Sequence, residues 1–319
     1  HDYLGFHPKP NFRVEGACAS GSMAIRTAFM TIGAGLADVV LALGAEKMTE
    51  VDTPTATEIM SKGGDSLWEY PFGVSFPGYY ALIAQAHMAR YGTTEEQLAM
   101  VAVKNHHYGA MNPVAHMQKE VSLEAALSSM MIAHPLKLYD CSLISDGAAA
   151  VILASEGKAR EFLKEPVWVA GLGLGTDSLS ICERRDLTSL AGAVYAADQA
   201  YRMSGIGPDD VDVACVHDCF TIAEIVAYED LGFCKKGEGG RLIEEKQTYV
   251  EGKIPVNVDG GLKSKGHPVG ATGVSMAVEI TKQLRGEAGP RQVNNAGIGL
   301  THNVGGSGQI AAVHIFRRE

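Results

Sequence analysis

The sequence predicts an α/β fold in which strands and helices alternate along the chain. Apolar runs that end at glycine, such as 38–43 (DVVLAL), are typical of buried strands, whereas the apolar spacing over 20–34 follows the period of a helix. The segments 19–24 and 271–277 also resemble each other, and each opens a predicted helix after a glycine-containing turn. This internal repeat predicts two similar α/β units packed about a pseudo-twofold axis.

The predicted elements fall into two blocks separated by a stretch of different composition. Residues 51–135, where Pro, Gly, Met and His are frequent, are predicted to form an inserted subdomain with helices over 79–91 and from Thr94, a candidate cap. The predicted strands elsewhere cover 12–16, 38–43, 148–154, 167–172, 211–216, 255–258, 297–301 and 309–316, and the predicted helices cover 20–34, 190–203, 221–231 and 272–284. Because strands alternate with helices, we expect parallel sheets covered by helices.

The composition argues against several classes of protein. With 319 residues, 46% of them hydrophobic, the chain is long enough for a large core or for two similar halves. A formal net charge of -10 argues against nucleic acid or an anionic membrane as a partner, and no apolar run reaches the length of about 18 residues that a membrane-spanning helix needs. Six cysteines without a CxxC pair favour a reduced, cytoplasmic compartment over a disulfide framework.

The first candidate for chemistry is the segment 16–21 (GACASG), which lies between a predicted strand and a predicted helix. A cysteine at a helix N-terminus faces the positive end of the helix dipole and unpaired N–H groups, and both favour the nucleophilic thiolate. Its small neighbours let a carbonyl group approach Cys18 closely, and the Cys18 N–H could bind an oxyanion. The alternative is a small buried cysteine at a tight packing point, and this segment alone does not decide between them.

Three further segments place polar groups at predicted turns. The box 217–220 (HDCF) follows an apolar strand and precedes a helix, and 265–273 (KGHPVGATG) presents His267 just ahead of a helix, where a neutral imidazole is favoured. The second segment matches neither the GxGxxG nor the GxxxxGK[ST] phosphate loop. The segment 303–308 (NVGGSG) is either a hairpin loop or a set of N–H donors aimed at a developing negative charge.

A metal site is an unfavoured alternative. Cys215, His217 and Cys219 alternate as strand neighbours do, but three candidate ligands without a matching partner pair are a poor zinc signature. We therefore expect no metal.

The Cys18 turn, the HDCF box, GHPVGATG and the final glycine turn resemble the thiolase superfamily in their order and approximate spacing, over essentially the whole chain. The HDCF box resembles that of the archaeal and sterol-carrier-protein type, whereas the commoner type has Asn-Glu-Ala-Phe there. The resemblance implies two duplicated α/β/α halves in a five-layer αβαβα arrangement. Residues 1–50 and 136–160 would form the N-terminal half, 51–135 a loop domain that covers coenzyme A, and 161–319 the C-terminal half. Because only 17 residues precede Cys18, we expect the N-terminal half to lack its opening strands.

The resemblance also implies a role for each polar group. Cys18 would carry the acyl group after His267 helps to deprotonate it, and Cys219 would remove the α-proton of a second acetyl-CoA. His217 and His267 would donate hydrogen bonds to the enolate oxygen, and the N–H groups of Cys18 and Gly305 would hold the oxyanion of acyl transfer.

One departure from the commoner thiolases concerns the second catalytic cysteine. Those enzymes carry it in the last glycine turn, where this chain has Asn303. In the subgroup that this chain resembles, the cysteine of the HDCF box takes that duty. Met111 and His116 resemble part of the loop domain and are candidates for contacting coenzyme A.

These roles imply an acetyl-CoA C-acetyltransferase that condenses two acetyl-CoA molecules to acetoacetyl-CoA, feeding the mevalonate pathway of isoprenoid biosynthesis. We expect no bound cofactor, coenzyme A thioesters as substrates, and a homodimer or a dimer of dimers. The resemblance also suggests a complex with hydroxymethylglutaryl-CoA synthase through a small zinc-ribbon and OB-fold protein.

Three alternatives stay open. The chain could be a 3-oxoacyl-CoA thiolase for longer chains, a ketoacyl synthase-like condensing enzyme, or a non-catalytic thiolase-like scaffold subunit. A ketoacyl synthase needs no second cysteine base, so Cys219 discriminates against it.

Overall fold

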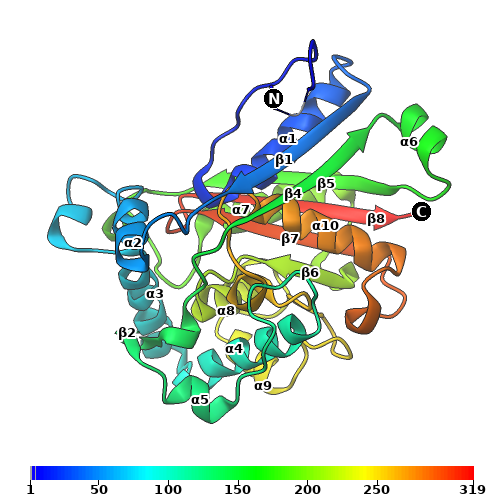
Figure 1. Ribbon diagram of the computed structural model, residues 1–319. Helices are drawn as coiled ribbons and strands as arrows, with labels where there is room; N and C mark the ends of the chain where they lie inside the picture. The colour runs from blue at the N-terminus through cyan, green and yellow to red at the C-terminus, as the bar shows by residue number, and fades with distance from the viewer. Residues whose placement is uncertain (1, 4) are drawn as a thin grey trace.

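Two β-sheets with a pair of helices between them form the centre of the molecule (Figure 1). The computed structural model describes residues 2–3 and 5–319. One sheet pairs β1 (Val39–Glu46) with β4 (Gly147–Ala154), and the other has four strands in the order β5-β8-β7-β6. Helix α1 (Ser20–Gly33) packs on β1, while α10 (Thr272–Arg285) contacts α1, β4 and β7 and so lies between the two sheets.

The remaining elements surround this centre. The four-stranded sheet consists of β5 (Val167–Thr176), β6 (Val213–Val216), β7 (Ile298–Gly305) and β8 (Ile310–Arg318), and α7 (Ala191–Ser204) covers β5 and β8. The stretch of chain that connects β1 to β4 forms α2 (Thr53–Ser61), α3 (Phe76–Tyr91), α4 (Glu95–Ala110), α5 (Leu123–Leu127), β2 (Met131–Ala133) and β3 (Leu136–Lys137). The others are α6 (Glu156–Phe162), α8 (Thr221–Asp230) and α9 (Gly239–Glu244).

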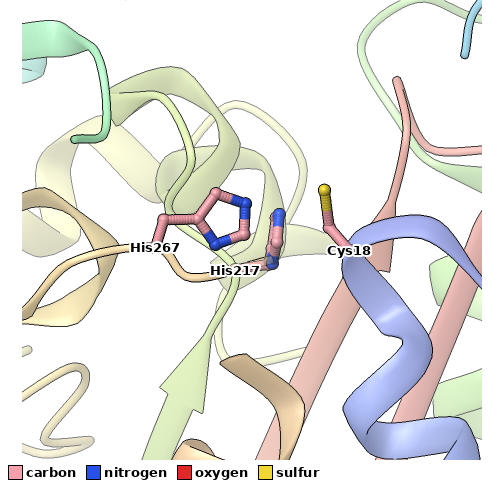
Figure 2. Close-up of side chains that lie close together, drawn as sticks. All are labelled: Cys18, His217 and His267. Carbon is pink, nitrogen blue, oxygen red and sulfur yellow. The ribbon is translucent and has the colours of Figure 1, made fainter. Parts of the chain in front are cut away.

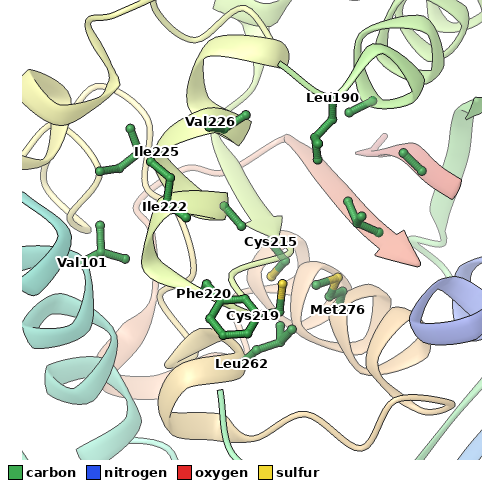
Figure 3. Packing of buried hydrophobic residues seen from close by; sticks show 14 of the residues in the cluster. Val101, Leu190, Cys215, Cys219, Phe220, Ile222, Ile225, Val226, Leu262 and Met276 are labelled. Carbon is green, nitrogen blue, oxygen red and sulfur yellow. The ribbon is translucent and has the colours of Figure 1, made fainter. Parts of the chain in front are cut away.

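Helix α8 is the centre of the lower half of the molecule in Figure 1. Every residue of this helix is buried, because α3, α4, α7 and α9 all pack against it. Figure 3 shows Ile222 and Ile225 of α8 packed close to Val101 of α4. The inserted stretch 51–135 therefore packs directly on the helix that follows the HDCF box.

The predicted helices are confirmed, with ends that differ by a few residues. Thr94 is the predicted cap: its Oγ1 accepts a hydrogen bond from the Gln97 N–H at 3.2 Å. Predicted strands correspond to β1, β4, β5, β6, β7 and β8. No helix among the described residues is both long and apolar enough to cross a membrane.

Two strand predictions and the prediction of parallel sheets are wrong. Residues 12–16 form no strand and are mostly exposed, and of 255–258 only Val256 pairs, through a single bridge to Ala214. The pairs β1–β4, β5–β8 and β7–β8 are antiparallel, and among the described strands of the two central sheets only β6 and β7 run parallel. The tight glycine turn after β7 reverses the chain at once, so β8 has to return beside β7.

The predicted α/β class is confirmed, and four of the expected five layers are present in the order sheet, helices, sheet, helices. In the described part of the chain the outer face of the β1–β4 sheet keeps apolar side chains exposed, among them Val39, Leu41, Leu43 and Ile152. The division of the chain into halves at 1–50, 136–160 and 161–319 stays a prediction.

Helices α1 and α10 approach each other closely at their first turns. A Cβ atom added to Gly21 would lie 2.7 Å from the Val274 nitrogen, and one added to Gly273 would lie 2.3 Å from the Ser22 nitrogen. The two backbones thus touch where any larger residue would separate them. Since Cys18 lies just before α1 and His267 just before α10, this contact brings the two segments side by side.

Replacing Gly273 by alanine should separate the two helices. We expect Gly273→Ala to lower the free energy of unfolding by about 1–3 kcal/mol, because the new methyl group overpacks a backbone contact. Urea denaturation followed by circular dichroism measures this change. The control is Gly33→Ala in α1, where an added Cβ has no neighbour within 4 Å. Equal stabilities for the two variants would contradict the proposed role of the contact.

Candidate active site

The four predicted catalytic side chains, those of Cys18, His217, Cys219 and His267, line one cavity of about 620 Å³. They come from three segments: the turn before α1, the connection from β6 to α8, and the loop before α10. The Cys18 Sγ and one ring nitrogen of each histidine lie within 4.8 Å of one another. Figure 2 shows the His217 ring between Cys18 and His267.

The Cys18 turn has a strained backbone. Ala17, immediately before the cysteine, has a φ of 50°, in the left-handed region that residues other than glycine rarely adopt. The turn is held from within, because the Ser20 hydroxyl donates to the Ala17 carbonyl at 2.7 Å and accepts from the Gly16 N–H at 2.9 Å. This geometry presents Cys18 to the cavity at the start of α1.

The Cys18 thiol is protonated near neutral pH. Burial raises its pKa to about 11, although the N–H groups of Gly306 and of Cys18 itself hydrogen-bond to the sulfur and act in the opposite direction. The expectation of a thiolate-prone cysteine at the helix end is therefore wrong for the free site, because desolvation outweighs these donors. A base has to take the proton when the sulfur attacks.

His267 presents a ring nitrogen within 4.8 Å of the Cys18 sulfur. Its Nδ1 lies 2.8 Å from the Thr272 hydroxyl oxygen, which is itself 3.0 Å from the Pro268 carbonyl oxygen. Since the Thr272 hydroxyl donates its single hydrogen to that carbonyl, it must accept from His267 Nδ1–H. The Nε2 of His267 is then unprotonated. Burial lowers the pKa of His267 to about 3, so the ring is neutral and able to accept a proton.

His217 has the opposite tautomer. Its Nδ1 accepts from the Asn303 side-chain amide at 3.1 Å, which leaves the hydrogen on Nε2. Burial, followed by the neighbouring His267, lowers its pKa well below the usual range. The two rings meet edge to face with centroids 5.0 Å apart. One imidazole is thus built to accept a proton and the other to donate a hydrogen bond, and both are uncharged, as predicted for His267.

Cys219 lies deeper than Cys18, with 7% of its surface exposed. Burial raises the pKa of its thiol far above the usual value, and the nearby Cys18 and Asp218 act in the same direction. A hydrogen bond from Tyr80 and the charge of Lys263 oppose this shift. Cys219 is consequently a neutral thiol at rest.

The last glycine turn packs on the Cys18 turn. The N–H that reaches the Cys18 sulfur belongs to Gly306, one residue beyond the predicted donor Gly305, whose role stays a prediction. Arg184 fixes this turn by donating to the Ser307 carbonyl at 2.7 Å and to the Ser307 hydroxyl at 2.9 Å.

Asp218, which the sequence analysis did not single out, joins two parts of the site. Its carboxylate accepts from the N–H groups of Leu262 and Lys263, at 2.7 and 3.2 Å, and from the Asn105 amide at 2.8 Å. It thereby fixes the HDCF box to the turn that leads to His267. A Cβ added to Gly261 would lie 2.3 Å from this carboxylate, so only glycine fits there. The signal available in the sequence was the position of this carboxylate between two candidate catalytic residues, His217 and Cys219.

Three separate segments thus form one site. Comparison with known proteins shows the family to which the chain belongs. Residues 3–157 match the family description "Thiolase, N-terminal domain" and residues 173–318 match "Thiolase C-terminal domain-like". The chain belongs to the thiolase family. The predicted family and thiolase-like fold are therefore confirmed.

Individual proteins that are similar to this thiolase support the same family. It is 50% identical over 317 residues to a Methanothermobacter thermautotrophicus protein named acetyl-CoA acetyltransferase, covering 99% of this chain and 82% of the relative. It is 39% identical over 321 residues to Bos taurus sterol carrier protein 2, covering 96% of this chain and 59% of the relative. A solved Ltp2-ChsH2(DUF35) aldolase superposes with a TM-score of 0.81 at 26% identity, over 94% of this chain and 77% of that one.

The predicted contacts of Met111 and His116 with coenzyme A stay a prediction. Among residues 2–3 and 5–319, the cavity lining includes neither Met111 nor His116. Met111 packs against the core, and His116 Nδ1 is 3.0 Å from the Ser145 hydroxyl, which also accepts from the His267 N–H. The stretch 51–135 contributes cavity residues that the sequence did not indicate, namely Thr53, Thr57, Met60, Gly63, Phe76, Pro77, Tyr80, His106, Met117 and Ile132.

Cys18, His217 and His267 form the group that could hold a metal ion in the part of the chain that the structure describes. The set contains the proposed nucleophile and has no fourth protein ligand, and Cys215 is not a member of it. The expectation that the enzyme uses no metal stays a prediction.

The protonated state of Cys18 can be measured by alkylation. Since only the thiolate reacts, the rate of Cys18 alkylation by iodoacetamide should rise about tenfold per pH unit from pH 7 to 9 and show no plateau near neutrality. Peptide mass spectrometry quantifies the adduct, with the exposed Cys182 as an internal reference. A plateau reached below pH 7 would mean that Cys18 is already a thiolate.

Proposed function

We propose that this thiolase is an acetyl-CoA C-acetyltransferase, which condenses two acetyl-CoA molecules reversibly to acetoacetyl-CoA and CoA through an acetyl-Cys18 intermediate. The observation that carries the proposal is the presence of two cysteines and two imidazoles of opposite tautomer in one cavity. The 50% identity to a protein named acetyl-CoA acetyltransferase supports the choice of substrate.

In the first half-reaction Cys18 takes the acetyl group. His267 Nε2 accepts the Cys18 proton as the sulfur attacks the thioester carbon, while the Nδ1–H bond to Thr272 stabilises the imidazolium that forms. The N–H groups at Cys18 and Gly306, which hydrogen-bond to the resting sulfur, are close enough to stabilise the oxyanion. Collapse of the tetrahedral intermediate breaks the C–S bond to CoA, and the CoA thiolate receives the proton from His267.

In the second half-reaction the thiolate of Cys219 removes a proton from the α-carbon of another acetyl-CoA and becomes a thiol. The electron pair of the C–H bond passes into an enolate, whose oxygen accepts a hydrogen bond from His217 Nε2–H. The enolate carbon then attacks acetyl-Cys18, and the Cys18 sulfur leaves. His267 can donate to the enolate oxygen only while it holds a proton, so His217 is the principal donor at this step.

The resting protonation states suit the cleavage direction. With Cys219 as a thiol and Cys18 paired with a neutral His267, acetoacetyl-CoA can be attacked at its 3-carbonyl while Cys219 protonates the departing carbon. In the condensation direction Cys219 must first lose its proton. We therefore expect condensation to accelerate with rising pH more steeply than cleavage.

The open alternatives differ in what they need from Cys219. A ketoacyl synthase-like enzyme generates its carbanion by decarboxylation and does not use a second cysteine in the cavity. A scaffold subunit uses neither cysteine. A thiolase for longer chains uses both and differs only in preferring longer acyl groups. The shared cavity of Cys18 and Cys219 favours a thiolase.

The proposal also includes a cellular role and protein partners for this thiolase. Acetoacetyl-CoA would feed the mevalonate pathway in the cytoplasm, and the resemblance to archaeal thiolases supports a complex with hydroxymethylglutaryl-CoA synthase through a zinc-ribbon and OB-fold protein. A homodimer or a dimer of dimers is proposed on the same resemblance.

Removing each cysteine tests the mechanism. Cys18→Ala should abolish both acetylation by labelled acetyl-CoA and the cleavage of acetoacetyl-CoA by CoA. Cys219→Ala should still be acetylated at Cys18 but lose about 10²- to 10⁴-fold in cleavage, the usual contribution of a general acid or base. Cys182→Ala, which removes an exposed thiol, is the control. Wild-type cleavage in either active-site variant would exclude the role assigned to that cysteine.

Thr272 should matter through the His267 tautomer. Thr272→Val removes the acceptor for Nδ1–H, so we expect the rate of Cys18 acetylation to fall about 3- to 10-fold, the value of one neutral hydrogen bond. Rapid-quench mass spectrometry measures this step. The matched control is Thr281→Val on the same helix, where the hydroxyl also donates to the carbonyl four residues earlier, that of Ala277 at 2.7 Å. Equal losses in both variants would point to a helix effect instead.

A further inference from the structure

We infer that Tyr80 of α3 is a positioning residue for Cys219, and that its hydroxyl hydrogen turns from the Gly306 carbonyl to the Cys219 sulfur whenever that sulfur is ionised. This inference rests on the proposed function, in which Cys219 exchanges a proton with the α-carbon of the substrate.

The Tyr80 hydroxyl lies between the two halves of the catalytic site. Its oxygen is 3.4 Å from the Gly306 carbonyl oxygen, and the hydroxyl lies close enough to Cys219 to lower the pKa of that thiol as a hydrogen-bond donor does. Tyr80 lines the same cavity as both cysteines, with 1% of its surface exposed. The hydroxyl therefore has two partners and one hydrogen to give.

The ring that carries this hydroxyl is held by the HDCF box itself. Tyr80 stacks on Phe220 with centroids 4.7 Å apart and an interplanar angle of 27°. Phe220 directly follows Cys219, and α3 packs against α8, which begins at the next residue. The same packing thus fixes the position of Tyr80 relative to Cys219, and only the rotation of the Tyr80 O–H bond is free.

The two protonation states of Cys219 need different partners. As a thiol, Cys219 can donate its hydrogen to the Tyr80 oxygen, while the Tyr80 hydrogen is donated to the Gly306 carbonyl. As a thiolate, Cys219 can only accept, so the Tyr80 hydrogen turns toward it. When the α-carbon gives its proton to the sulfur, the S–H bond forms and the hydroxyl turns back. No further reactant is needed.

Other groups around Cys219 cannot replace this donor. Cys18 and Asp218 carry negative charge when ionised and oppose a thiolate, and Lys263 favours one. The Lys263 Nζ is buried and makes no hydrogen bond, so it acts only through its charge. Among the described residues, Tyr80 is the side chain that lowers the pKa of Cys219 as a hydrogen-bond donor does. Hydrogen bonds to ionised acceptors are about twice as strong as neutral ones, which makes this contact selective for the thiolate.

The test compares Tyr80→Phe with Tyr79→Phe. The first keeps the ring on Phe220 and removes only the hydroxyl; the second removes a hydroxyl from an equally buried neighbour on the same helix that does not line the cavity. The readout is the exchange of the acetyl-CoA methyl protons with D₂O, followed by NMR, which reports proton abstraction without requiring product. Acetylation of Cys18, measured by mass spectrometry, reports a folded site and the first half-reaction.

We expect Tyr80→Phe to slow the methyl exchange about 10- to 100-fold, the range for a hydrogen bond to a charged group, and to shift the rising limb of its pH profile to higher pH. Cys18 acetylation should stay within about twofold of wild type, and Tyr79→Phe should match wild type in both measurements. Unchanged exchange in Tyr80→Phe, or a loss of exchange and acetylation in equal measure, would overturn the inference. A wild-type enzyme that neither exchanges the methyl protons nor acetylates Cys18 would instead refute the proposed function.

Discussion

The site depends on a contact between two backbones. Helices α1 and α10 meet at Gly21 and Gly273 more closely than any side chain would allow, and the segments just before them carry the nucleophile and its base. The carboxylate of Asp218 then fixes the HDCF box to the turn that precedes His267. Three parts of the chain that are distant in sequence are thus held together by contacts that do not involve a catalytic atom, so the catalytic groups are free to change their hydrogen bonds during turnover.

A second principle is the absence of charge on the catalytic side chains at rest. Burial raises the pKa values of both thiols and lowers those of both imidazoles, so all four are neutral near pH 7. Helices α1, α8 and α10 all begin near the cavity, and their N-termini favour negative over positive charge. The resting site therefore holds no catalytic charge that occupies the fixed hydrogen-bond donors, so these donors stay available for the oxyanion and the enolate.

Most of the fold could be predicted from the sequence, because the helices that flank the site carry clear periodic patterns and glycine punctuation. The direction of the strands could not, since pairing depends on long-range contacts: β8 returns beside β7 only because of the turn at 305–308. The proposed catalytic residues could be indicated from the sequence because they stand in short, chemically unusual segments, and the structure places them in one cavity. Tyr80, Asn303 as a partner of His217, and Thr272 as a partner of His267 are ordinary residues, and their roles follow only from which atoms they face. The roles of Met111 and His116 stay predictions, because a segment that resembles a cover for coenzyme A need not direct each side chain into the cavity, and among the described residues neither lines it.

The residue Gly306 has a consequence for how the two halves of the site are linked. Its N–H contacts the nucleophilic sulfur, and its carbonyl oxygen lies beside the Tyr80 hydroxyl. These two groups belong to successive peptide units that meet at the Gly306 Cα, where φ is 63° in the left-handed region. Any change of this backbone angle would therefore displace the donor at Cys18 and the acceptor at Tyr80 together. The surroundings of the two cysteines cannot drift apart independently, because one glycine sets the orientation of a group at each of them.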